Sequence, residues 1–131
     1  MIVLDTHALM VYLEKEPGYA KVRDILAKAA ESGKPCLMTY VNWGEIFYQA
    51  YRAGGLRQAD DVMDLVATFP IELVEVGGDI ARQAGIYKAT KKMSYADCFA
   101  AALAKLKKAE LITGDKEFKE VADEIHIQWL S

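Results

Sequence analysis

Four acidic residues stand where an acidic side chain needs an explanation. Asp5 directly follows a short apolar run, and Asp115 follows another after a single glycine. Glu45 lies inside a largely apolar helical pattern, and Asp97 lies in the first turn of a second one. Two unit charges about 4 Å apart repel by about 4 kcal/mol at an effective dielectric constant of roughly 20, so four carboxylates in one pocket need a cation. Oxygen ligands of this kind suit Mg²⁺ or Mn²⁺.

The nitrogen and sulfur ligands that zinc prefers are not arranged for a metal. His7 and His126 lie at opposite ends of the chain, and Cys36 and Cys98 form no CxxC pair. We interpret His7 as a surface residue at the start of a helix, and both cysteines as small buried hydrophobic residues. A zinc site is therefore not expected.

Each acid also has a structural explanation of its own. Asp5 and Asp115 could cap the helices that follow them, and Ser94–Asp97 matches a capping box that ends in aspartate. Capping is the simpler explanation for that aspartate taken alone. Glu45 could lie at a helix edge or pair with Arg52. A shared site is favoured because at least three of the four acids map to one edge of a sheet.

The chain that must position these acids has the composition of a folded domain. It has 131 residues, of which 53% are hydrophobic and 27% are charged, so we expect one domain over residues 1–131. Its formal net charge of −3 gives no overall basic field for nucleic acid, so such binding must come from local clusters of basic residues. We find neither a signal peptide nor a membrane-spanning run and expect a cytoplasmic protein.

Short apolar runs alternate with helical patterns, which is typical of βαβ units and a parallel sheet. The strands are expected at Ile2–Leu4, Cys36–Met38, Ile71–Val76, Leu111–Thr113 and Ile125–Trp129. The helices are expected at about His7–Glu14, Tyr19–Ser32, Tyr40–Ala53, Arg57–Phe69, Asp79–Lys91, Ser94–Lys107 and Glu117–Val121. The pattern predicts four or five parallel strands with helices on both faces. Since ligands of open α/β sheets bind outside the carboxyl ends of the strands, Asp5 is expected at the ligand edge.

Four segments together resemble PIN-domain ribonucleases and, within them, the VapC-type toxins of bacterial and archaeal toxin–antitoxin pairs. They are Met1–Leu9, Thr39–Ala50, Ser94–Ala104 and Ile112–Phe118, which occur in the order found in that family. The resemblance covers nearly the whole chain. It implies a three-layer α/β/α PIN-like fold whose acidic pocket binds Mg²⁺ or Mn²⁺ and cuts RNA.

The resemblance also assigns residues and partners. The family's acidic positions, which would bind the metal and carry the catalysis, correspond to Asp5, Glu45, Asp97 and Asp115. Thr6 and Thr113 fall where a hydroxyl residue often lies beside the metal. Thr113 would belong to the catalytic set, and Thr6 would support the metal-binding carboxylates by a hydrogen bond. Asn42, three residues before Glu45, could face the same pocket. The implied partners are an RNA substrate, a VapB-like antitoxin and a second copy of the chain.

RNA needs a positive rim beside an acidic pocket. Lys88, Lys91 and Lys92 precede the Asp97 helix and are candidates for phosphate contacts, although an ordinary solvated helix end is a slightly better explanation of them.

Two apolar groups could form interfaces, although core packing also accounts for most of their members. The aromatic group that could form a dimer interface is Trp43, Phe47, Tyr48 and Tyr51. The group that could line a groove for an antitoxin helix is Tyr12, Leu13, Val22 and Leu26.

Other functions fit the pattern less well. A haloacid-dehalogenase-type phosphatase needs a second aspartate two residues after Asp5, where this chain has His7. A phospho-receiver domain needs an acceptor aspartate after the third strand, where Asp79 is better explained as a helix cap. Two further alternatives are a PIN-type RNA-processing nuclease without an antitoxin and a non-catalytic module that binds RNA or protein.

Overall fold

The computed structural model describes residues 1–130 and is built on a five-stranded sheet in which all paired strands run parallel. The strands are β1 (Ile2–Leu4), β2 (Cys36–Thr39), β3 (Ile71–Val74), β4 (Glu110–Thr113) and β5 (His126–Trp129). Their order in the sheet is β3-β2-β1-β4-β5. The chain therefore builds outward from β1 through β2 to β3, then returns to the other side of β1 for β4 and β5. The junction between β1 and β4 is the switch point at which open α/β sheets bind ligands.

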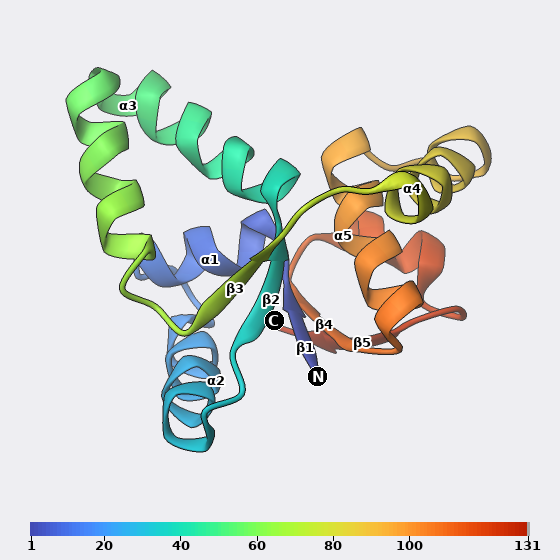
Figure 1. Ribbon diagram of the computed structural model, residues 1–131, viewed down its shortest axis with the longest axis horizontal. Helices are drawn as coiled ribbons and strands as arrows, with labels where there is room; N and C mark the ends of the chain where they lie inside the picture. The colour runs from blue at the N-terminus through green and yellow to red at the C-terminus, as the bar shows by residue number, and fades with distance from the viewer. Residues whose placement is uncertain (131) are drawn as a thin grey trace.

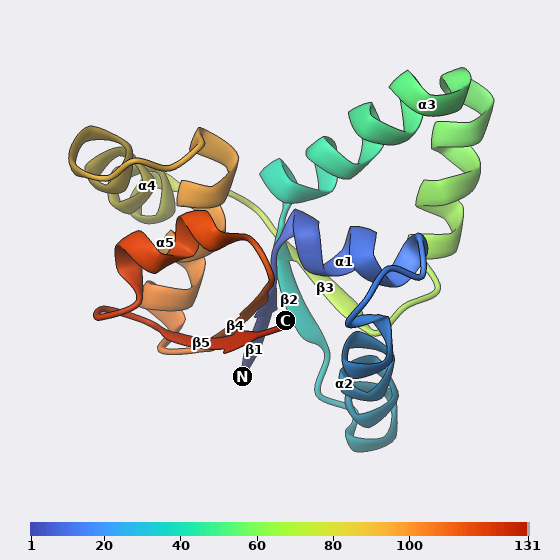
Figure 2. The same cartoon turned by 180° about the vertical axis from the view of Figure 1, so that it is seen from behind.

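Helices cover both faces of the sheet, which confirms the predicted three-layer α/β/α architecture (Figure 1). They are α1 (Thr6–Leu13), α2 (Tyr19–Ser32), α3 (Tyr40–Val66), α4 (Gly78–Thr90), α5 (Tyr95–Lys107) and the short 3₁₀ helix η1 (Lys116–Val121). Helices α1, α2 and α3 lie on one side, and α4, α5 and η1 lie on the other, as the view from behind also shows (Figure 2).

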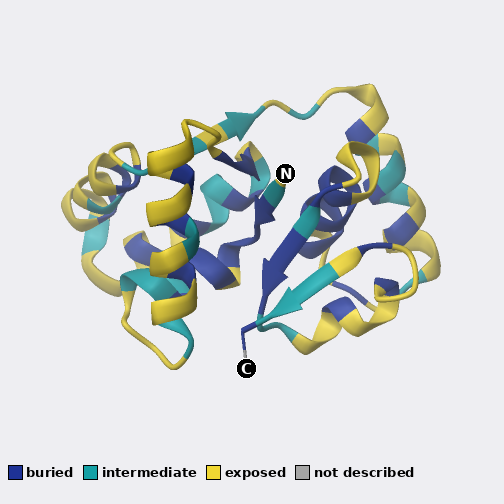
Figure 3. Ribbon diagram, turned by 90° about the horizontal axis from the view of Figure 1, so that it is seen from below, coloured by how far each residue is buried: buried dark blue, intermediate teal, exposed yellow. Residues whose placement is uncertain are grey.

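The central strand serves both layers. Val3 packs into the core beneath α4 and α5, whereas the next residue, Leu4, packs into the core beneath α1, α2 and α3, and both side chains are fully buried. This two-sided burial is the reason that the first strand reads as an uninterrupted apolar run. Burial falls toward the edges of the sheet, where β5 is half-exposed (Figure 3).

The largest departure from the predicted elements is in α3. The sequence predicts two helices separated by Gly54–Gly55, whereas α3 runs from Tyr40 to Val66 and changes direction partway (Figure 1). Gly55 has φ 86° and ψ −178°, so the helical geometry does break at the predicted place. The residues on each side resume the helix at once, with no loop between them.

Smaller differences concern element ends. Helix α1 begins at Thr6 rather than His7 because the Asp5 side chain caps it, and β3 stops at Val74 instead of Val76. The expectation that Asp79 is the N-cap of α4 is wrong: Gly77 is the cap residue, and Asp79 lies in the first turn.

Across residues 1–130, we find no helix with the length and apolar character needed to cross a membrane.

We predict that Gly55→Ala lowers the free energy of unfolding by about 1–3 kcal/mol, since its φ and ψ lie in a region open essentially only to glycine. A Cβ there would meet no neighbour, so the cost is backbone strain alone. The measurement is urea unfolding followed by circular dichroism.

The matched control is Gly85→Ala in the middle of α4, where a Cβ also meets no neighbour and φ is not positive. This variant should gain about 0.5–1 kcal/mol, because alanine is the better helix former. An equal effect of the two substitutions would contradict the assigned break at Gly55.

Candidate functional site

Asp5 lies at the carboxyl end of β1 and is fully buried. Its Oδ1 accepts a hydrogen bond from the Ala8 N–H at 2.7 Å, and its Oδ2 accepts one from the Thr113 hydroxyl at 2.5 Å. The pKa of Asp5 is raised to about 7, mainly by burial and to a lesser extent by the charges of Asp115 and Glu45, although both hydrogen bonds oppose the rise. This carboxylate is therefore held in place by two hydrogen bonds, and no basic side chain within residues 1–130 forms an ion pair with it.

The register of the sheet explains why Thr113 meets Asp5. Leu4 of β1 pairs with Ile112 of β4, so the next residues of the two strands lie side by side at the switch point. Thr113 is fully buried, and its hydroxyl oxygen also accepts the Asp115 N–H at 3.0 Å. One threonine thus fixes the Asp5 carboxylate and the backbone that carries Asp115.

Asp97 reaches the same edge from the start of α5. It is buried, and its pKa is raised to about 8, mainly by that burial and then by the charges of Asp115 and Asp5. Asp97 and Asp115 belong to a group of three acids whose nearest ligand oxygens all lie within 4.8 Å of one another. The third member of this group is Glu117, which the sequence analysis missed.

Glu117 also explains why Asp97 is not occupied by helix capping. Ser94 caps α5 through its hydroxyl, which accepts the Asp97 N–H at 3.3 Å. In the predicted capping box, the Asp97 carboxylate would accept the Ser94 N–H. That N–H instead donates to Glu117 Oε1 of η1 at 2.7 Å. In the sequence, the one signal that could indicate a site role for Glu117 is its position two residues after Asp115. An exposed acid in a short helix gives no reason by itself to expect such a role.

Glu45 is half-buried in α3 and is not a member of the group of three acids. It lies close enough for its charge to raise the pKa of Asp5. Its Oε2 accepts a hydrogen bond from the Tyr48 hydroxyl at 3.2 Å. The predicted alternative of pairing with Arg52 is not what the structure has, because that guanidinium stacks 4.8 Å above the Tyr48 ring.

Thr6 and Asn42 lie behind the acids. The Thr6 hydroxyl donates to the Asn42 carbonyl oxygen at 3.3 Å and accepts from Asn42 Nδ2 at 3.2 Å. Both residues are buried. Thr6 therefore contacts Asn42 and not a site carboxylate, in contrast to Thr113.

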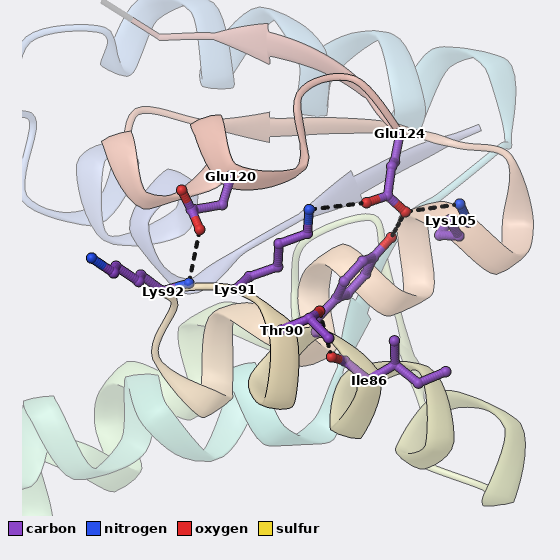
Figure 4. Close-up of polar contacts among 8 residues, drawn as sticks. Ile86, Thr90, Lys91, Lys92, Lys105, Glu120 and Glu124 are labelled. Carbon is purple, nitrogen blue, oxygen red and sulfur yellow. Dashed lines mark hydrogen bonds and ion pairs between the residues drawn. The ribbon is translucent and has the colours of Figure 1, made fainter.

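The candidate lysines have partners within the chain. Lys88 Nζ donates to the Met93 carbonyl oxygen at 2.9 Å, and Lys91 Nζ lies 3.6 Å from Glu124. Glu124 pairs with Lys91 and Lys105, and we call these three residues the Glu124 cluster. Lys92 is bound through its backbone N–H, and its side chain points away from this cluster (Figure 4). Of the three candidates, Lys92 is the one whose ammonium group makes no hydrogen bond or ion pair within residues 1–130.

The predicted surface position of His7 is confirmed: it is exposed, and its Nδ1 accepts the Gly114 N–H at 3.2 Å.

The predicted antitoxin groove is largely core, since Val22 and Leu26 are buried. Tyr48 and Tyr51 of the aromatic group are exposed on α3.

The site therefore fits a hard divalent cation. All the grouped donors are carboxylate oxygens, Asp97 of the group and the neighbouring Asp5 are buried, and the charges that raise the pKa of Asp97 come from other acids. Such a set carries uncompensated negative charge that Mg²⁺ or Mn²⁺ would offset.

A cavity of about 1010 Å³ lies at the opposite end of the sheet, near the starts of β1 and β2. None of the site acids lines it.

Comparison with known proteins agrees with this arrangement. A family model described as PIN domain matches residues 2–124. No curated protein matches the chain at a significant level.

Solved structures share the fold over almost the whole chain. DNA-bound VapBC from Salmonella typhimurium matches with a TM-score of 0.75 at 17% identity, covering 99% of this chain and 98% of that one. VapBC-1 from nontypeable Haemophilus influenzae matches with a TM-score of 0.73 at 20% identity, covering 99% of this chain and 98% of that one. VapC20 from Mycobacterium tuberculosis, a toxin that cleaves the sarcin-ricin loop, matches with a TM-score of 0.69 at 18% identity, covering 98% of this chain and 99% of that one.

We predict that the metal-free protein loses stability as the pH rises from about 4.5 to 8. Asp5 and Asp97 have pKa values of about 7 and about 8 in the folded chain, compared with 3.8 ordinarily. Within this range the folded chain keeps protons that the unfolded chain releases, so the free energy of unfolding falls by up to about 1.4 kcal/mol per pH unit for each such carboxyl. The measurement is urea unfolding in EDTA at a series of pH values.

Asp97→Asn should flatten this slope, whereas Asp64→Asn, an exposed acid on α3, should leave it unchanged. Mg²⁺ should also reduce the slope, because it favours the ionised carboxylates. Stability that rises between pH 5 and 8 in the metal-free parent would show that the buried acids are not under electrostatic strain.

Proposed function

Since the chain belongs to the PIN domain family, we propose that it is a metal-dependent endoribonuclease and the toxin of a VapBC-type toxin–antitoxin pair. The observation that carries the proposal is the convergence of Asp5, Asp97 and Asp115 at the β1–β4 switch point. A hard divalent ion is the simplest means of making that convergence stable. The reaction would be hydrolysis of an RNA phosphodiester bond.

Asp97 and Asp115 would hold the ion, together with Asp5, Glu45 and Glu117 directly or through water. A bound Mg²⁺ or Mn²⁺ would supply a water of lowered pKa and offset the negative charge that develops on the phosphate.

The chain's own residues would keep this group in its working arrangement. Thr113 fixes the orientation of Asp5 through its hydroxyl and of Asp115 through the backbone N–H. Asp115 Oδ1 accepts the Glu117 N–H at 2.9 Å, which leaves its second oxygen for an ion or a water. The N-terminus of α5, beside Asp97, adds a positive helix-dipole end that would favour a phosphate group at the rim.

The toxin assignment rests on the fold shared with chains of VapBC complexes. From it we propose a VapB-like antitoxin as a partner and the cytoplasm, where RNA is available, as the location. A homodimer is also part of the proposal. Tyr48 and Tyr51 support it because exposed aromatic side chains on one helix are common at interfaces.

Lys88, Lys91 and Lys92 remain candidates for RNA contact, with Lys92 the strongest. Its side chain is exposed and is not drawn into the Glu124 cluster. Lys88 and Lys91 would have to leave their partners within the chain to bind phosphate.

Asp5→Asn should reduce cleavage of a pool of structured RNAs in Mn²⁺ by more than about 100-fold, because it removes a charge from the ion site. The fold should persist, since the asparagine oxygen can still accept the Ala8 N–H. Sequencing of the cut ends in the parent reaction would identify the substrate. Asp64→Asn is the matched control and should cleave like the parent.

Expression in a bacterial host separates the toxin role from RNA processing. The parent should arrest growth, Asp5→Asn should not, and a small DNA-binding protein encoded beside the gene should relieve the arrest. Cleavage by purified Asp5→Asn at the parental rate would disprove the site. Parental cleavage without growth arrest would favour a processing nuclease.

Lys92→Ala should weaken RNA binding and reduce the slope of log affinity against log salt by about one ion, because one phosphate contact is lost. Lys34→Ala, an exposed lysine in the α2–β2 loop, is the matched control and should change neither quantity. The measurement is fluorescence anisotropy in Ca²⁺ at several salt concentrations. An unchanged salt slope for Lys92→Ala would remove this residue from the RNA interface.

A further inference from the structure

Asn42, in the first turn of α3, has a fully buried side chain with all of its polar atoms in use. Its Oδ1 accepts a hydrogen bond from the Thr39 hydroxyl at 2.6 Å. Its Nδ2 donates to Thr6 Oγ1 and to the Ala96 carbonyl oxygen, both at 3.2 Å. One carboxamide therefore joins the end of β2, the start of α1 and the first turn of α5.

Each of these contacts lies one step from a site acid. Thr6 directly follows Asp5 in the chain, and Ala96 directly precedes Asp97. Asn42 itself is one helical turn before Glu45 on α3. The carboxamide thus connects the three segments that carry these acids, although none of its own hydrogen bonds is made to a carboxylate.

On the basis of the proposed function, we propose that Asn42 is a positioning residue that sets the spacing of Asp5, Glu45 and Asp97 for metal binding. The two links to Thr6 and Ala96 require a donor, and the link to Thr39 requires an acceptor. Asparagine supplies both on a short side chain, whereas aspartate offers no donor and leucine offers neither. The like charges of the acids push their segments apart, and the hydrogen bonds of Asn42 to Thr6 and Ala96 hold two of those segments together.

A purely structural role and a positioning role make different predictions. Removing any buried hydrogen-bonded amide lowers stability. Only positioning also weakens metal binding in protein that remains folded, as loss of residues that orient metal ligands does in other metal sites. Metal affinity is therefore the readout that separates the two roles.

The experiment titrates Mn²⁺ into the purified full chain by calorimetry at a temperature where every variant is folded. Asn42→Leu should weaken Mn²⁺ binding by about 10- to 100-fold relative to the parent. It should lower kcat for RNA at subsaturating Mn²⁺ while KM stays within about twofold of the parent, because the RNA rim is untouched; excess Mn²⁺ should restore much of the lost kcat.

Val66→Ala is the matched control, since Val66 is a buried residue of the same helix at its far end. It should lower stability without changing Mn²⁺ affinity. Thr6→Val removes only one of the three links and should give a smaller loss of affinity of the same kind. It also provides the test if Asn42→Leu does not fold. Combined, the two substitutions should be less than additive, because they break the same connection.

The outcomes separate this inference from the proposed function. A parent that binds Mn²⁺, with Asn42→Leu or Thr6→Val binding it equally well, overturns the positioning role and leaves the nuclease proposal standing. A parent that binds no Mn²⁺ overturns both. Reduced affinity in Val66→Ala as well would mean that loss of stability alone weakens the site, which also overturns the positioning role.

Discussion

The central constraint in this molecule is that several carboxylates share the carboxyl edge of one sheet with little solvent to separate them. Asp5 is fully buried and Asp97 nearly so; the charge of Asp115 raises the pKa of both, and the charge of Asp5 also raises that of Asp97. Burial and like charge act in the same direction, so the metal-free edge is a weak point in the stability of the fold. The strand order makes it unavoidable, because β1 and β4 end side by side and both lead into acids. A fold optimised for stability alone would place apolar or neutral residues there.

The surrounding contacts resist the separation that this repulsion favours. Thr113 ties Asp5 to the Asp115 backbone, and Glu117 ties the start of α5 to η1 by accepting the Ser94 N–H. On the other side of β1, Asn42 joins β2, α1 and α5. These links are short side chains bound to backbone or hydroxyl groups, which allow little movement. The edge is therefore preorganised, and an ion entering it would find its ligands already near one another.

Much of this arrangement could be predicted from local sequence, and the remainder depends on tertiary contacts. An apolar run that stops at an acid predicts both a doubly covered strand and the position of Asp5, because strand burial and chain order are local properties. The role of Glu117 could not be predicted, since it depends on an N–H of Ser94, 23 residues away. The continuation of α3 past Gly54–Gly55 could not be predicted for a similar reason: Gly55 adopts its non-helical φ and ψ, and the helix resumes because both of its halves pack against the core. The engagement of Lys91 by Glu124 is also a long-range contact that a helix-end pattern does not contain.

The structural and functional explanations of these acids turn out to be compatible. Asp5 caps α1 and Asp115 caps η1, as the capping interpretation requires. Asp115 nevertheless belongs to the group of three acids, and Asp5 lies close enough to it for the charge of Asp115 to raise the pKa of Asp5. An ionised carboxylate has about four lone-pair positions, so one that accepts a single N–H still has others to offer to an ion or a water. Capping also aims the carboxylate, because an N-cap side chain is fixed against the first turn of its helix. The N-cap residues Asp5 and Asp115, which follow β1 and β4, thus present oriented carboxylate oxygens at the switch point. The residues that cap these two helices are therefore also the ones best placed to bind a cation there.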